Sequence, residues 1–120
     1  MKILGIDDNE DINKLFQVAL NSMGHEFSYS LTGREGLELI RKNKYDVVLL
    51  DLAMPEFSGI ELLSSLEHEG LIDKQKIIIV TASSVVDREL SEFRQKGISD
   101  CLKKPVDLDA LLTRIEAVAA

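Results

Sequence analysis

Five polar side chains that could carry out metal and phosphate chemistry lie directly after, or one residue beyond, short stretches rich in apolar residues: Asp7, Asp8, Asp51, Thr81 and Lys104. One aspartate after a strand is usually a turn or helix-cap residue, but adjacent aspartates repel each other unless a cation lies between them. A hard divalent ion such as Mg²⁺ prefers a few carboxylate oxygens together with water. A metal alone gives Thr81 and Lys104 no role, whereas the oxygens of a transferring phosphoryl group need a hydroxyl donor and a positive charge. These residue types therefore predict a site for Mg²⁺-assisted phosphoryl chemistry.

The elements that must position these side chains follow from the apolar periodicity. Short continuous apolar or alternating runs predict strands at residues 3–6, 27–31, 47–50, 77–80 and 98–102. Apolar residues spaced by three and four predict helices at residues 12–23, 33–40, 59–66, 84–96 and from 107 onward. Two of these helices are preceded by capping-box sequences, which begin at Thr32 and Ser58 and have a glutamate three residues later.

Five alternations of strand and helix predict an α/β fold, a parallel sheet covered by helices on both faces. A length of 120 residues suits one domain, residues 1–120, built as a five-stranded, doubly wound (βα)5 sheet. A closed eight-stranded barrel would need about twice that length. Sites in doubly wound sheets form outside the carboxyl ends of the strands, which is where the five polar residues are expected to meet.

Composition excludes several classes of function. The 14 basic and 21 acidic residues give a net charge of −7, which argues against direct binding to nucleic acid or to an anionic membrane. The single cysteine, Cys101, excludes an internal disulfide framework. No apolar run approaches the roughly 20 residues that span a bilayer, and none at the N-terminus forms a signal sequence. We therefore expect a cytoplasmic protein.

In their order and in their places at strand ends, these residues resemble the receiver domains of two-component response regulators, of the chemotaxis-regulator type. The motif consists of the acidic pair, the segment 48–55 around Asp51, and then Gly59, residues 80–82 and Lys104-Pro105. The resemblance covers essentially the whole chain and implies the flavodoxin-like receiver topology. It also implies a phosphorylation-activated signalling domain in place of an enzyme, with at most slow autophosphorylation from small donors and slow autodephosphorylation.

The resemblance implies a role for each metal-site residue. Asp8 and Asp51 would bind Mg²⁺ directly, together with the backbone carbonyl of Ala53, and Asp7 would act mainly through a bound water. Mn²⁺ could take the place of Mg²⁺.

The resemblance likewise implies the phosphoryl chemistry and the partners. Asp51 would be the phosphoacceptor, taking its phosphoryl group from a sensor histidine kinase or a phosphotransfer protein. Lys104 would pair with a phosphoryl oxygen, and the Lys104–Pro105 peptide would be cis. Thr81 would move to hydrogen-bond the phosphoryl group and so change the surface of the fourth helix, fifth strand and fifth helix. This surface would bind a downstream protein target, and the domain would be a monomer or a phosphorylation-dependent dimer.

Cys101 departs from the family pattern. Many receivers have Tyr or Phe at this place on the fifth strand, where the ring swings inward when the threonine moves. A thiol has no ring to rotate, so either the Thr81 movement is transmitted only by the loop after the fourth strand and the fourth helix, or the output is weaker. For Cys101 itself we expect a small, buried strand residue.

Three other functions remain open on the sequence. An aspartyl-nucleophile phosphatase also uses Mg²⁺, Asp, Thr and Lys, but it needs an acid two residues after the nucleophile, where this chain has Ala53. A flavodoxin-type flavin domain shares the fold but needs a phosphate-binding loop after the first strand, where this chain has the largely acidic segment 7–11. A pseudo-receiver that signals without phosphate is the third. The chain could act as a stand-alone receiver or as part of a longer regulator.

Overall fold

The computed structural model describes residues 1–82, 91 and 97–119. It contains a five-stranded, fully parallel sheet in the order β2-β1-β3-β4-β5. The strands are β1 (Lys2–Ile6), β2 (Glu26–Ser30), β3 (Val47–Leu50), β4 (Lys76–Thr81) and β5 (Ile98–Lys103). The strand order reverses direction at β1, which confirms the predicted doubly wound, flavodoxin-like sheet.

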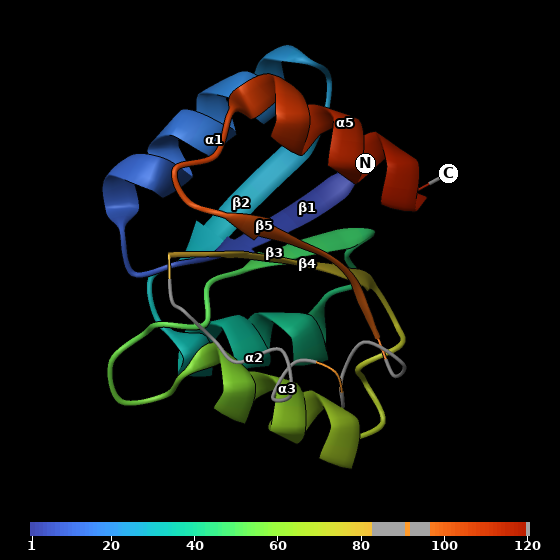
Figure 1. The fold of residues 1–120 in the computed structure, drawn as a ribbon. Coiled ribbons are helices and arrows are strands. Elements are labelled where there is room, and N and C mark those ends of the chain that lie inside the picture. Colours follow the sequence, from blue (N-terminus) through green and yellow to red (C-terminus); the bar gives the residue numbers. More distant parts are fainter. Residues whose placement is uncertain (83–90, 92–96, 120) are drawn as a thin grey trace.

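The helices lie on both faces of the sheet (Figure 1). They are α1 (Glu10–Ser22), α2 (Gly33–Lys42), α3 (Gly59–His68) and α5 (Leu108–Ala119). Figure 1 shows α1 and α5 on one face and α2 and α3 on the other. The helix predicted over residues 84–96 falls almost wholly outside the described residues. Among the described helices, none combines the length and the apolar character needed to cross a membrane.

Two apolar clusters fill the space between the sheet and its helices. Leu4, Val48 and Ile77 belong to the cluster under α2 and α3, which we call the α2–α3 core. Ile3 and Ile78, on the same strands, belong to the cluster under α1 and α5. Because successive side chains of a strand point to opposite faces, a strand buried on both faces must be apolar throughout. This is the physical reason for the continuous apolar runs in the sequence.

Polar side chains cap the N-termini of α2 and α3. Thr32 Oγ1 accepts a hydrogen bond from the N–H of Glu35 at 3.2 Å, at the start of α2. Ser58 Oγ accepts from the N–H of Glu61 at 3.2 Å, at the start of α3. These contacts satisfy helix N–H groups that have no partner within the helix, and they place both helix starts where the capping-box sequences predict them.

The face of α1 differs from the prediction. Leu15 belongs to the apolar spacing that predicts the helix over residues 12–23, but it is 52% exposed. Met23, the C-cap residue just after α1, is 50% exposed, whereas the polar Asn13 is buried. Asn9 Oδ1 accepts from the N–H of Ile12, so that Asn9 is the N-cap and the helix begins at Glu10. Asn13 lies one turn after this cap and faces the sheet, where its Nδ2 donates to the carbonyl of Asp7 at 2.9 Å. The carbonyl of Asp7, just after β1, needs a hydrogen-bond donor. This requirement places the polar side chain of Asn13 on the buried face of α1.

Candidate functional site

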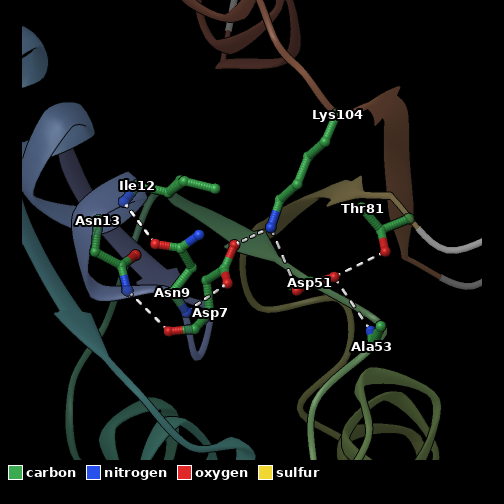
Figure 2. Close-up of polar contacts among 8 residues, drawn as sticks. All are labelled: Asp7, Asn9, Ile12, Asn13, Asp51, Ala53, Thr81 and Lys104. Carbon is green, nitrogen blue, oxygen red and sulfur yellow. Dashed lines mark hydrogen bonds and ion pairs between the residues drawn. The ribbon is translucent and has the colours of Figure 1, made fainter.

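The carboxyl ends of β1, β3 and β4 bring the predicted site residues together (Figure 2). Asp7 follows the last residue of β1, Asp51 follows the last residue of β3, and Thr81 ends β4. The N–H of Asp51 donates to the carbonyl of Ile6 at 3.0 Å, which extends the pairing of β1 with β3 to the site itself. The sheet, with both faces covered, is a rigid support for these side chains.

The three aspartates form one acidic group. Asp7, Asp8 and Asp51 each offer a carboxylate oxygen, and these oxygens lie within 4.8 Å of one another. Asp7 and Asp51 are buried, whereas Asp8 is exposed. Carboxylate oxygens at this spacing, with one open to solvent, fit a hard divalent cation that keeps some of its water. The acidic group could therefore hold a metal ion.

Donors from three parts of the chain hold the Asp51 carboxylate in place. Its Oδ1 accepts from the hydroxyl of Thr81 at 2.7 Å and from the N–H of Ala53 at 3.1 Å. Its Oδ2 lies 3.4 Å from the ammonium nitrogen of Lys104. These contacts fix the orientation of a group that is only 5% exposed and align it with a hydroxyl and a cation.

Lys104 lies between the two buried aspartates. Its Nζ is 2.5 Å from Asp7 Oδ2, and Asp7 Oδ1 accepts from the N–H of Asn9 at 2.9 Å. Burial raises the pKa of the Asp7 carboxyl, and the hydrogen bonds from Lys104 and Asn9 only partly oppose this effect. Burial lowers the pKa of Lys104, but Asp7 and Asp51 raise it by more, so that the Lys104 pKa lies above its ordinary value. Lys104 is thus held as the cation of the site.

The chain after β5 delivers Lys104 to this position. The N–H of Lys104 donates to the carbonyl of Thr81 at 3.1 Å, which continues the pairing of β5 with β4 for one more residue. The Lys104–Pro105 peptide is cis, as the family resemblance implies.

Two asparagines of the site were not singled out from the sequence. Asn9 donates its N–H to the Asp7 carboxylate and caps α1, and Asn13 donates its side chain to the Asp7 carbonyl. Together they tie the start of α1 to the segment that carries the acidic pair. The signal in the sequence is a polar residue, Asn13, between Ile12 and Phe16 at the start of an otherwise apolar helical face.

Cys101 lies on β5 and is not one of the residues that form the acidic group. It is on β5 opposite Ile79, is only partly buried, and packs against the α2–α3 core. This is close to the expectation of a small buried strand residue. Among the described residues, the site itself contains no aromatic side chain from β5.

Close packing at Gly59 supports the loop that follows Asp51. A Cβ at residue 59 would lie 2.6 Å from the carbonyl oxygen of Asp51 and 2.7 Å from the Cα of Leu52, both of them backbone atoms. We expect Gly59→Ala to lower the free energy of unfolding by about 1–3 kcal/mol, because this backbone must shift to make room. Urea unfolding measures the change. Ser64→Ala, at an exposed position of α3, is the control and should stay within about 0.5 kcal/mol of the parent. Equal stability of the two variants would show that the backbone of this loop can shift without a measurable loss of stability.

Comparison with known proteins places the chain in a family. The family model of the response regulator receiver domain matches residues 3–116. The chain belongs to this family, whose members are signalling domains of two-component systems.

Curated relatives match the chain over nearly its whole length. The transcriptional regulatory protein DltR of Streptococcus agalactiae is 33% identical over 115 residues, which are 96% of this chain and 50% of that protein. The cell cycle transcriptional regulator CtrA of Caulobacter vibrioides is 32% identical over 118 residues, 98% of this chain and 50% of that protein. The chain thus spans about half the length of these relatives.

Solved structures share the fold. The receiver domain of Francisella response regulator 1452 superposes with a TM-score of 0.85 at 30% identity, covering 98% of this chain and 95% of that one. Response regulator TrrA of Thermotoga maritima, solved in complex with Mg²⁺ and BeF, superposes with a TM-score of 0.80 at 27% identity, covering 98% and 97%. One of these neighbours is a receiver domain and the other a response regulator, and both share the fold of this chain.

Proposed function

We propose that this chain is a phosphorylation-activated switch whose phosphoacceptor is Asp51. The observation that carries the proposal is the setting of the Asp51 carboxylate. One oxygen is held by Thr81 and the Ala53 N–H, and the other lies 3.4 Å from Lys104 beside an acidic group suited to a divalent cation. A carboxylate so oriented needs only to be ionised and in line with an incoming phosphorus atom.

The proposed transfer is a displacement at phosphorus. A carboxylate oxygen of Asp51 attacks the phosphorus of a phosphohistidine on a sensor kinase or phosphotransfer protein, forming an O–P bond as the P–N bond breaks. The imidazole nitrogen leaves with the electron pair and is protonated from solvent. Lys104 pairs with the developing charge on the phosphoryl oxygens, and the Thr81 hydroxyl donates to one of them.

Four residues would hold the cation that assists this step. Asp8 and Asp51 would bind Mg²⁺ directly with the carbonyl of Ala53, and Asp7, already paired with Lys104, would act mainly through a bound water. When bound, Mg²⁺ or Mn²⁺ reduces the repulsion between the Asp51 carboxylate and the phosphoryl oxygens.

The phosphodonor would approach the rim formed by α1 and the segment after β5. A hollow of about 180 Å³ lies there, lined by Ile12, Leu15, Lys104, Pro105 and Val106. Leu15 is 52% exposed and Val18, further along α1, is 71% exposed. Exposed apolar side chains beside a charged site fit a protein donor better than a small metabolite.

The output would come from Thr81 and the surface beyond it. Thr81 ends β4, whose neighbour β5 leads to Lys104 and α5, so a Thr81 movement toward a phosphoryl oxygen would reach β5 and α5 through these connections. The helix predicted over residues 84–96 would complete that surface. A downstream protein, or a second phosphorylated copy of the chain, would bind there in the cytoplasm.

Incubation with acetyl phosphate tests the proposal. With Mg²⁺ present, intact mass spectrometry is expected to show one phosphoryl adduct. With the divalent ion removed by EDTA, we expect adduct formation to fall by about 10²-fold or more, because several negative charges then crowd one pocket.

Two results would count against the proposal. Formation of the same adduct without any divalent ion would remove the role of the acidic group. Steady turnover of phosphate esters would identify a phosphatase instead. A beryllofluoride mimic, read by amide NMR, distinguishes a receiver with very rapid hydrolysis from one that never binds phosphate.

A further inference from the structure

A second hollow lies at the end of the sheet away from Asp51. It has a volume of about 290 Å³, between the end of α2, the connection from α2 to β3 and the connection from α3 to β4. Figure 1 shows both connections at the end of the sheet where β3 and β4 begin. Asp51 and Thr81 lie at the opposite ends of these two strands, so an occupant of this hollow would leave the phosphoacceptor open.

The hollow has an apolar floor and a positively charged rim. Ile40 and Tyr45, each 4% exposed, and the half-buried Leu71 form most of the floor. Lys44 and Lys74 line the rim, both are exposed, and neither makes an ion pair within the described part of the chain. No Asp or Glu is among the lining residues.

The acidic side chains of the adjoining segments are partly engaged elsewhere. Glu69 forms a two-point contact with Arg41, with its carboxylate oxygens 2.7 and 2.6 Å from the guanidinium nitrogens. Asp46 accepts from the backbone N–H of Lys2 at 2.7 Å. Asp73 precedes Lys74 and is exposed, but it does not line the hollow. In a chain with a net charge of −7, the lining of this hollow has two positively charged residues and no negatively charged one.

Hydrogen bonds to the backbone fix the walls of the hollow. Asn43 Nδ2 donates to the carbonyl of Leu39 at 3.1 Å, and Gln75 Nε2 donates to the carbonyl of Leu71 at 2.8 Å. The N–H of Lys76 donates to the carbonyl of Asp46 at 3.0 Å, which joins the two connections. A site whose walls are already ordered loses little conformational entropy when it binds a ligand.

We propose that this hollow binds a short acidic peptide segment of a partner protein. One aliphatic or aromatic side chain of the segment would lie on the floor, and flanking carboxylates would face Lys44 and Lys74. The volume is at the low end of ligand sites, about 300 Å³, which suits one large side chain. A nucleic acid fits poorly, because it is bound through several phosphate contacts and this hollow offers only two lysines.

Amide NMR of the ¹⁵N-labelled protein tests this proposal with defined peptides. The probe is acetyl-Asp-Asp-Leu-Asp-Asp-amide, and two matched peptides replace either its Leu by Gly or its Asp residues by Lys. We expect saturable shifts confined to residues 43–45 and 71–75 with the first peptide only, at a Kd on the order of 1 mM or tighter. Added salt should weaken the binding, because exposed charges are screened.

Charge reversal identifies the surface. The Lys44→Glu, Lys74→Glu double variant should weaken binding about tenfold or more, since both rim charges then repel the peptide. Lys14→Glu, the same change at an exposed position of α1, should leave binding unchanged. Thermal unfolding checks that all variants are folded.

Three outcomes would overturn the proposal. They are no saturable shift at peptide concentrations up to about 10 mM, equal binding of the peptide that lacks Leu, and unchanged binding by the double variant. None of these measurements involves Asp51 or a phosphodonor. The result of this test is therefore independent of whether the chain is a phosphorylation switch.

Discussion

An Asp51→Asn variant is expected to accept no phosphoryl group from acetyl phosphate in the presence of Mg²⁺. The amide has nearly the shape of the carboxylate, and its oxygen can still accept the Thr81 and Ala53 hydrogen bonds, which in the parent protein are 2.7 and 3.1 Å long. It lacks the negative charge that makes the oxygen a nucleophile. We expect adduct formation to fall by more than about 10³-fold, as measured by intact mass over time.

Two further variants make this result decisive. Asp51→Ala also lacks the nucleophile and cannot revert by deamidation, so it should give the same loss. Asp46→Asn, an exposed carboxylate at the other end of the sheet, removes the same charge and should leave the rate unchanged. The stability of Asp51→Asn should stay within about 1 kcal/mol of the parent, because the lost charge also relieves repulsion from Asp7. An adduct that persists in both Asp51 variants would place the phosphoacceptor elsewhere.

The architecture could be predicted from the sequence because its signals are local. A strand buried on both faces must be continuously apolar, as Val47–Leu50 is, and a helix N-terminus needs a side-chain acceptor, as at Thr32 and Ser58. Each signal depends only on neighbouring residues. The parallel sheet then follows from the alternation of elements, since parallel strands need a crossover between them.

The convergence of Asp7, Asp51, Thr81 and Lys104 could also be predicted, because the carboxyl ends of parallel strands share one edge. The partner of the Lys104 ammonium within the site could not be predicted from the residues. The family resemblance assigns Lys104 to a phosphoryl oxygen, and the structure places its ammonium nearer to Asp7, at 2.5 Å, than to Asp51, at 3.4 Å. That preference depends on the positions of the Asp7 carboxylate, held by the N–H of Asn9, and of Lys104, whose backbone is paired with Thr81. Both positions are set by tertiary contacts.

The exposed face of α1 shows a second limit of sequence reasoning. Hydrophobic periodicity assigns Leu15 to the core, but a helix on one face of the sheet can bury only a narrow stripe, and Asn13 occupies part of it. The strand predicted over residues 27–31 differs from the structure in the same way. The observed strand β2 ends at Ser30, and Leu31, the next residue, is 37% exposed. Apolar residues within a helical or strand pattern can therefore be exposed at the edge of the sheet or beside the site.

Replacing Lys104 by Met is expected to change both stability and phosphorylation. The Lys104 side chain is 15% exposed and those of Asp7 and Asp51 are 8% and 6% exposed, so the variant leaves two buried carboxylates without their cation. Without divalent ions, the free energy of unfolding should fall by roughly 2–4 kcal/mol in urea titrations. Mg²⁺ should recover much of this loss, because a divalent cation bound by the acidic group neutralises the same carboxylates.

The rate at which Lys104→Met forms the adduct from acetyl phosphate should fall by about 10²-fold even with Mg²⁺ present, since no ammonium then pairs with the phosphoryl oxygens.

Lys103→Met is the matched control, because Lys103 is the preceding residue and is exposed. Its stability should stay within about 0.5 kcal/mol of the parent, and its rate of adduct formation should be unchanged. The two effects of Lys104→Met depend on different contacts and can fail separately. A variant as stable as the parent without divalent ions would mean that other groups compensate the charges of Asp7 and Asp51. An unchanged rate with Mg²⁺ would mean that Lys104 serves only to neutralise the aspartates, which would leave Thr81 and the metal as the groups that respond to phosphate.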